Sequence, residues 1–181
     1  MAYLLRALIL IMFLGSILTI GLAHSWFTLS FSHIQVAIPF FLYTIFAQAF
    51  VMFYFIGTGR LVDNIHLILT SGKNLNEIFD RAPDDLSPYL KKVEKFVMDT
   101  KVSKRQTIPW TMLMLILGML GFLLGGAHDT GLVEKTTHSG VVYGFFAALV
   151  IGFFRQWYYL GKNHKLLRVL KATFELPDGQ M

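Results

Sequence analysis

Long uninterrupted apolar runs dominate the pattern of residues along this chain. No Asp, Glu, Lys or Arg occurs between Ala7 and Gly59, and two more uncharged runs cover 108–128 and 136–154. A helix of about 20 apolar residues crosses the hydrocarbon layer, so the first run has room for two crossings. Strands of a membrane barrel are about 10 residues long and alternate in polarity, so runs of this length indicate helices. The pattern predicts an all-α membrane four-helix bundle with spans near 4–24, 35–57, 108–128 and 138–160.

The first apolar run has an alternative interpretation as a secretory signal peptide. Arg6 precedes the run, and Gly21-Leu22-Ala23 resembles a cleavage site of small residues. We interpret it as an uncleaved anchor and count it as the first span.

Between and after the spans, apolar residues recur near helical period among charged ones. Such a stripe runs from Leu61 to Gly72, a glycine that suits a helix C-cap, and another runs from Leu90 to Val97. These stripes predict a helical cytoplasmic hairpin over 60–107, and a similar stripe predicts a C-terminal helix over 161–176. Packing of these units on each other is the favoured interpretation. A docking surface for another protein and a helix lying on the membrane surface are the alternatives.

Positive charge is distributed unevenly among the segments that connect the spans. Nine Lys or Arg lie in 60–107, five lie from Arg155 onward and Arg6 lies near the N-terminus, whereas the remaining loops hold only Lys135. Because Lys and Arg of short loops stay in the cytoplasm, both termini and the middle segment are predicted to be cytoplasmic. A bacterial inner membrane is the simplest fit to this bias.

Composition narrows the function classes that remain. The net charge of +5 is explained by topology, and seven acids interspersed in 60–107 make a nucleic-acid surface an unlikely reading. Anionic lipid headgroups are the expected partners of this charge. The absence of cysteine removes thiol redox chemistry and thiolate metal sites.

Small residues at four-residue spacing predict where membrane helices approach closely. Gly121 and Gly125 occur in the third span, and the fourth span has such residues at 140, 144, 148 and 152. We expect these two spans to form the tightest pair, with Gly144 near Gly121. Gln48, the most polar residue near the middle of the second span, should hydrogen-bond to a neighbouring helix.

Four histidines fall at the outer ends of the four predicted spans, one on each: His24, His33, His128 and His138. Antiparallel packing would bring these ends to one depth, where imidazoles could be axial ligands of haem b. Together with Asp129 they could instead bind copper or zinc. Outer-side proton entry or pH sensing uses the same residues. The alternative is that they are interfacial histidines without a ligand.

No nucleophile, phosphate-binding loop or nucleotide fingerprint can be assembled from the sequence, so an enzyme is disfavoured. No ionisable residue lies deep in a span, which also disfavours ion transport. The leading expectation is therefore a non-catalytic membrane subunit or scaffold that packs against other membrane proteins. The alternative is a haem- or metal-binding electron-transfer subunit that uses the outer histidines.

Overall fold

The structure is a computed structural model that describes residues 1–26, 30, 32–79 and 83–174. Within these residues it consists of four α-helices and one short 3-10 helix. The α-helices are α1 (Ala2–Ala23), α2 (His33–Ser71), α3 (Ser87–Asp129) and α4 (Lys135–Phe174), and the 3-10 helix is η1 (Leu75–Glu77). No strand occurs in the described part of the chain, so the predicted all-α class is confirmed.

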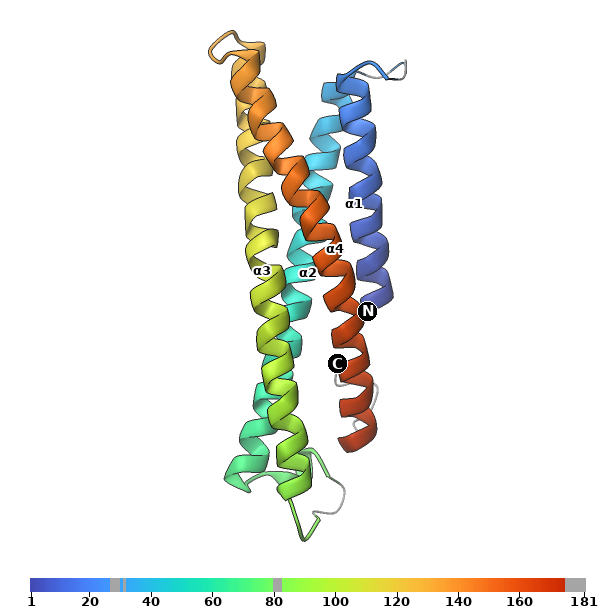
Figure 1. The fold of residues 1–181 in the computed structure, drawn as a ribbon, viewed down its shortest axis with the longest axis vertical. Coiled ribbons are helices and arrows are strands. Elements are labelled where there is room, and N and C mark those ends of the chain that lie inside the picture. Colours follow the sequence, from blue (N-terminus) through green and yellow to red (C-terminus); the bar gives the residue numbers. More distant parts are fainter. Residues whose placement is uncertain (27–29, 31, 80–82, 175–181) are drawn as a thin grey trace.

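The four helices form an elongated bundle in which each helix runs opposite to the one before it (Figure 1). α1 packs on α2 and α4, and α3 packs on the same two helices, whereas α2 and α4 have few contacts with each other. α1 is the shortest helix and covers only the upper half of the view. The lower half therefore contains α2, α3 and α4 without α1.

The helices continue beyond the predicted spans. α2 passes through Gly57 and Gly59 without interruption and ends at Gly72, whose φ of 65° is the left-handed C-cap conformation that the sequence predicts. α3 contains Pro109 in its interior and runs unbroken from the lower loop to Asp129. The predicted hairpin over 60–107 and the predicted C-terminal helix are thus extensions of α2, α3 and α4. Residues 80–82 of the hairpin and 175–176 of the C-terminal helix lie outside the described residues.

Two hydrophobic cores follow one another along the bundle. The upper core is formed by all four helices, with the buried side chains Leu5, Ile9, Met12, Val51, Phe55, Met114, Leu149 and Leu160. The lower core lies in the extension, with Val62, Ile65, Leu69, Ile78, Val93, Phe96, Leu166, Leu170 and Phe174. The apolar stripes of the two amphipathic segments therefore pack against each other, as the favoured interpretation expects.

Four helices are long and apolar enough to cross a membrane. At 1.5 Å per residue, the 22 residues of α1 span about 33 Å, close to the thickness of a hydrocarbon layer. The 43 residues of α3 span about 65 Å, which is roughly twice that thickness. Three of the helices are therefore long enough to cross the layer and to form the extension as well.

The close contacts between α3 and α4 occur at glycines other than the predicted one. A Cβ atom on Gly152 would lie 2.7 Å from Met114 Cε, and one on Gly118 would lie 3.3 Å from the Phe145 ring. A Cβ atom on Gly144 would be 3.9 Å from the Leu117 side chain, which is an ordinary contact. Gly144 does face α3, but Gly152, two turns further along α4, has the shorter Cβ contact, to the flexible end of the Met114 side chain.

Candidate functional site

Because the helices alternate in direction, the ends of α1 and α3 and the starts of α2 and α4 lie together at the upper end of the bundle in Figure 1. These segments carry the four histidines that the sequence analysis singles out. His24 follows α1 and His33 opens α2, while His128 lies in the last turn of α3 and His138 in the first turns of α4. A capping box between Ser32 and Gln35 fixes the start of α2 and so places His33 at its first position. Alternating helices thus bring the four residues to one end.

His128 and His138 are the histidine pair that the structure places in contact. Their ring centroids are 6.1 Å apart, and the ring planes differ by 11°. Nδ1 of His128 lies 3.1 Å from the backbone oxygen of Val133, which orients that ring from the α3–α4 loop. The ring of His138 packs on α3 at Gly125, where a Cβ atom would be 3.3 Å from its Cε1.

His24 is separate from this pair and is held by an aromatic residue of α4. Its Nε2 lies 3.0 Å from the hydroxyl of Tyr143, and its ring also stacks on Trp26. Because Tyr143 comes from α4, this hydrogen bond ties the end of α1 to the neighbouring hairpin. The contact is typical of an interfacial histidine.

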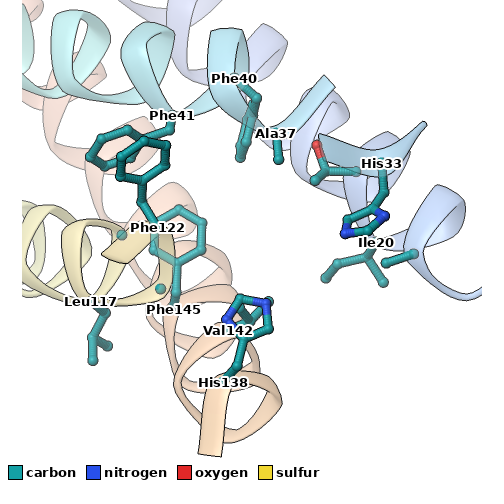
Figure 2. Close-up of a pocket in the computed structure, with 14 residues that line it drawn as sticks. Ile20, His33, Ala37, Phe40, Phe41, Leu117, Phe122, His138, Val142 and Phe145 are labelled. Carbon is teal, nitrogen blue, oxygen red and sulfur yellow. The ribbon is translucent and has the colours of Figure 1, made fainter. Parts of the chain in front are cut away.

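His33 and His138 both line a cavity of about 150 Å³ between the helices. Figure 2 shows the aromatic rings of Phe41, Phe122 and Phe145 at one side of this space and the two imidazoles at the other. The remaining lining is almost entirely apolar and comes from all four helices: Thr19, Ile20, Ala23, Ala37, Phe40, Leu117, Gly118, Gly121 and Val142. The cavity is partly open, so a ligand could enter it without unfolding of a helix.

The predicted copper or zinc site is not assembled. No group of three or more His, Cys, Asp or Glu side chains that could hold a metal ion occurs among the described residues. His24 is bonded to Tyr143 and His128 to a loop carbonyl, so the histidines face different partners although they share one end of the bundle. The structure has no group of metal ligands that includes Asp129. A haem with two histidine ligands needs only a pair, and that hypothesis stays a prediction.

A buried amide pair joins α2 to α4 within the upper core. Nε2 of Gln156 donates to Oε1 of Gln48 over 2.7 Å and to the hydroxyl of Thr111 on α3 over 2.9 Å. Nε2 of Gln48 is 3.3 Å from Oε1 of Gln156 and 3.2 Å from Sδ of Met12 on α1. Side chains of all four helices therefore meet at this point, which we call the amide seam: Met12, Gln48, Thr111 and Gln156. Both glutamines are fully buried.

The sequence indicated Gln48 but missed its partner. Gln156 follows Arg155 near the expected end of the fourth span, where a polar residue needs no buried partner. The spacing did indicate that Gln156 shares one helical face with Leu149 and Gly152. In the structure this face of α4 is buried.

Cationic and aromatic residues mark the inner end of the upper core. The Arg6 guanidinium donates to the backbone oxygen of Trp157 over 3.1 Å and lies 5.0 Å from the centroid of its ring. Arg155 bonds to Gln106 and lies 5.4 Å from the ring of Trp110. Positively charged groups beside aromatic rings are typical of the border between hydrocarbon and headgroups.

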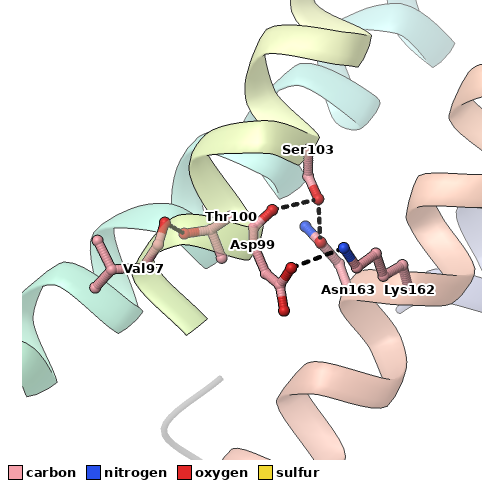
Figure 3. A network of polar contacts seen from close by, with 6 residues as sticks. All are labelled: Val97, Asp99, Thr100, Ser103, Lys162 and Asn163. Carbon is pink, nitrogen blue, oxygen red and sulfur yellow. Dashed lines mark hydrogen bonds and ion pairs between the residues drawn. The ribbon is translucent and has the colours of Figure 1, made fainter. Parts of the chain in front are cut away.

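A layer of polar residues lies between the two cores. Figure 3 shows its contacts, in which Ser103 and Asn163 are buried and Asp99 and Lys162 are partly exposed. Oγ of Ser103 on α3 lies 2.8 Å from Oδ1 of Asn163 on α4, and Lys162 forms a 2.7 Å ion pair with Asp99. The hydrogen bond to Asp99 raises the pKa of Lys162 above its usual value. The hydrogen bond between Ser103 and Asn163 forms only when these two residues are level, so it favours this register of α3 against α4.

Comparison with known protein families, with curated proteins and with solved structures gives no match to this chain.

Proposed function

We propose that this chain is a non-catalytic integral membrane subunit or scaffold with four membrane-spanning helices. In this proposal both termini and the extension are in the cytoplasm, and the membrane is a bacterial inner membrane. The fifteen-to-one distribution of Lys and Arg supports this orientation. The partners are membrane lipids and another membrane protein that contacts the extension.

The use of polar groups within the upper core supports a structural role. Gln48, Gln156 and Thr111 are bonded to one another between the chain's own helices. These groups are amides and hydroxyls, which do not titrate near neutral pH and have no adjacent base. Their arrangement stabilises a bundle and provides no set of reacting groups.

The observation that carries the proposal is apolar exposure outside the membrane-spanning part. Leu67 on α2 is 66% exposed and Met98 on α3 is 65% exposed, although both lie in the charged extension. Exposed apolar residues in the spans are covered by lipid and need no protein partner. Leu67 and Met98 would face water, and contact with another protein would remove their apolar surface from it.

Site-specific photocrosslinking in native membranes tests this proposal. A photoreactive amino acid at position 67 or 98 should yield an adduct with one recurring partner. Position 92, which is exposed and charged on another face of α3, should yield much less. A Leu67→Ser, Met98→Ser double variant should lose co-purification of that partner and keep its own stability, because neither side chain is buried. Absence of adducts at 67 and 98, or unchanged co-purification of the double variant, would contradict a protein-binding role.

A haem-binding electron-transfer subunit is the second candidate, with His128 and His138, whose ring centroids are 6.1 Å apart, as the expected pair of ligands. Nε2 of His128 is available to iron when Nδ1 donates to Val133. Purified protein would then show a Soret band that disappears in His138→Ala and persists in His66→Ala. Colourless protein from haem-supplied cells would rule this candidate out.

A further inference from the structure

We propose that the cavity lined by His33 and His138 binds the ring of a membrane quinone, with the isoprenoid tail leaving toward lipid. The inference does not depend on the scaffold function, because it rests on the upper end of the bundle and the scaffold proposal rests on the extension.

The cavity exists because side chains are missing where the two helical hairpins diverge. Gly118 and Gly121 on α3 contribute no side chains, and α2 and α4 have few contacts with each other. A Cβ atom on Gly118 would come within 3.3 Å of Phe145 and 3.6 Å of Phe41. Even a small side chain at this position would therefore crowd the cavity wall.

The size of the cavity suits a single six-membered ring. Its volume is about 150 Å³, and a dry apolar cavity of roughly that size can take up one benzene-sized molecule. Phe41 and Phe122 both line the cavity, and their rings stack on each other, parallel within 8° at a centroid distance of 4.8 Å. This stack gives the cavity a flat aromatic wall. An unfilled apolar space of this size would cost stability through lost packing contacts.

Two imidazoles provide the polar contacts that a quinone requires. His33 lies on α2 and His138 on α4, so they approach the space from different hairpins (Figure 2). Nδ1 of His138 is shielded from solvent and forms no hydrogen bond of normal geometry with the described residues. An imidazole N–H can donate to a quinone carbonyl oxygen, and a ring with two carbonyls can accept from both histidines.

Other occupants fit these features less well. A lipid acyl chain would fill the apolar part but has no polar atom for the imidazoles. A haem has four pyrrole rings and is much larger than a cavity that accommodates one ring. Apolar pockets with a few convergent polar groups are the usual form of small-molecule sites, and a quinone combines both requirements.

The test compares two ligands that differ only in the carbonyl groups. Radiolabelled benzoquinone with a decyl tail, and decylbenzene as the matched apolar probe, are titrated into lipid nanodiscs with and without the full chain. Wild-type protein should bind the quinone saturably, at about one molecule per chain, and bind decylbenzene more weakly. Absence of saturable quinone binding would overturn the proposal.

Substitutions then separate the contribution of the imidazole hydrogen bonds to ligand binding from the contribution of the cavity volume. His33→Leu and His138→Leu should each weaken quinone binding by about tenfold, the effect of one lost hydrogen bond, and leave decylbenzene unchanged. Gly118→Leu should abolish binding of both probes. Gly126→Leu is the matched control on α3, because a Cβ atom there meets nothing within 4 Å. His66→Leu is the histidine control.

Two further results would contradict the quinone site. Equal binding of both probes with no effect of His33→Leu or His138→Leu would identify a pocket for lipid chains. Unchanged quinone binding in Gly118→Leu would place the ligand elsewhere. Far-UV circular dichroism checks the fold of each variant, and the two histidine variants decide the result if Gly118→Leu does not fold.

Discussion

The amide pair of Gln48 and Gln156 allows the packing of the bundle to be tested quantitatively. Gln156→Leu keeps most of the side-chain volume but removes the bonds to Gln48 and Thr111. Gln48 would remain fully buried with only Met12 Sδ as a partner. Interhelical hydrogen bonds in membranes contribute about 0.6 kcal/mol on average, and an unsatisfied buried group costs about 1–3 kcal/mol. We therefore expect Gln156→Leu to lower the free energy of unfolding by about 2 kcal/mol.

The double variant Gln48→Leu, Gln156→Leu makes this argument specific. Gln48→Leu alone should cost about as much as Gln156→Leu, because each leaves the other amide without its main partner. With both replaced, neither amide is left buried alone, so the double variant should be more stable than either single variant. With single losses of about 2 kcal/mol each, that result corresponds to a coupling energy of at least about 2 kcal/mol.

The assay is reversible unfolding by SDS in mixed micelles, followed by far-UV circular dichroism. Phe53→Leu is the control on α2, the helix of Gln48. The Phe53 side chain is 65% exposed, so this substitution should change the free energy of unfolding little. If the double variant loses the sum of the two single losses, the amides do not act as a pair and the proposed seam is wrong.

Three other predictions concern contacts further along the bundle. Gly152→Leu should lower the free energy of unfolding by about 2 kcal/mol through overpacking, whereas Gly140→Leu should change it little in the same SDS assay, since a Cβ atom there meets nothing. Arg6→Gln should cost about 1 kcal/mol by removing a charged hydrogen bond to a backbone oxygen of α4. The pKa of Lys162 is raised from 10.5 mainly by its hydrogen bond to Asp99, so the ion pair stabilises the fold fully below pH 10.5 and less as the pH rises through the higher folded value. The partly exposed ion pair should contribute at most about 0.5 kcal/mol to the free energy of unfolding. Unfolding measured from pH 8 to 12 should show this loss of stability in the wild type and not in an Asp99→Asn variant.

Local features of the sequence were sufficient to predict the helices. Uncharged runs of about 20 residues are helical because buried amides must be paired within the segment. Gly72 was recognisable as a C-cap because the apolar stripe stops there and glycine adopts positive φ readily. The continuation of α2 and α4 into the extension follows from the same periodicity, whereas no apolar stripe predicted that α3 runs unbroken through 98–107.

The rotation of each helix about its axis could not be read from the sequence. The pairing of Gln48 with Gln156 joins residues 108 positions apart, and no local pattern specifies it. Packing likewise decides that a Cβ atom on Gly152 would meet the Met114 side chain closely and one on Gly144 would not, although both glycines belong to the same stripe of small residues.

The common end of the four histidines was predictable from alternating helix direction, but their partners were not. His24 is hydrogen-bonded to Tyr143, whereas His138 stacks with His128. The histidines predicted as metal ligands therefore contact different residues. The cavity depends on missing side chains and on the divergence of two hairpins, and neither appears as a motif.

The central claim is that the chain crosses a membrane four times, with its termini and extension on the cytoplasmic side. Accessibility of single cysteines tests it directly, because the natural chain contains no cysteine that would react. Cysteines replacing Lys73, Lys101 and Lys171 should react in intact cells only with a membrane-permeant reagent, whereas those replacing Ser30 and Lys135 should react with an impermeant one. Reaction of position 101 with the impermeant reagent in sealed cells would contradict the account.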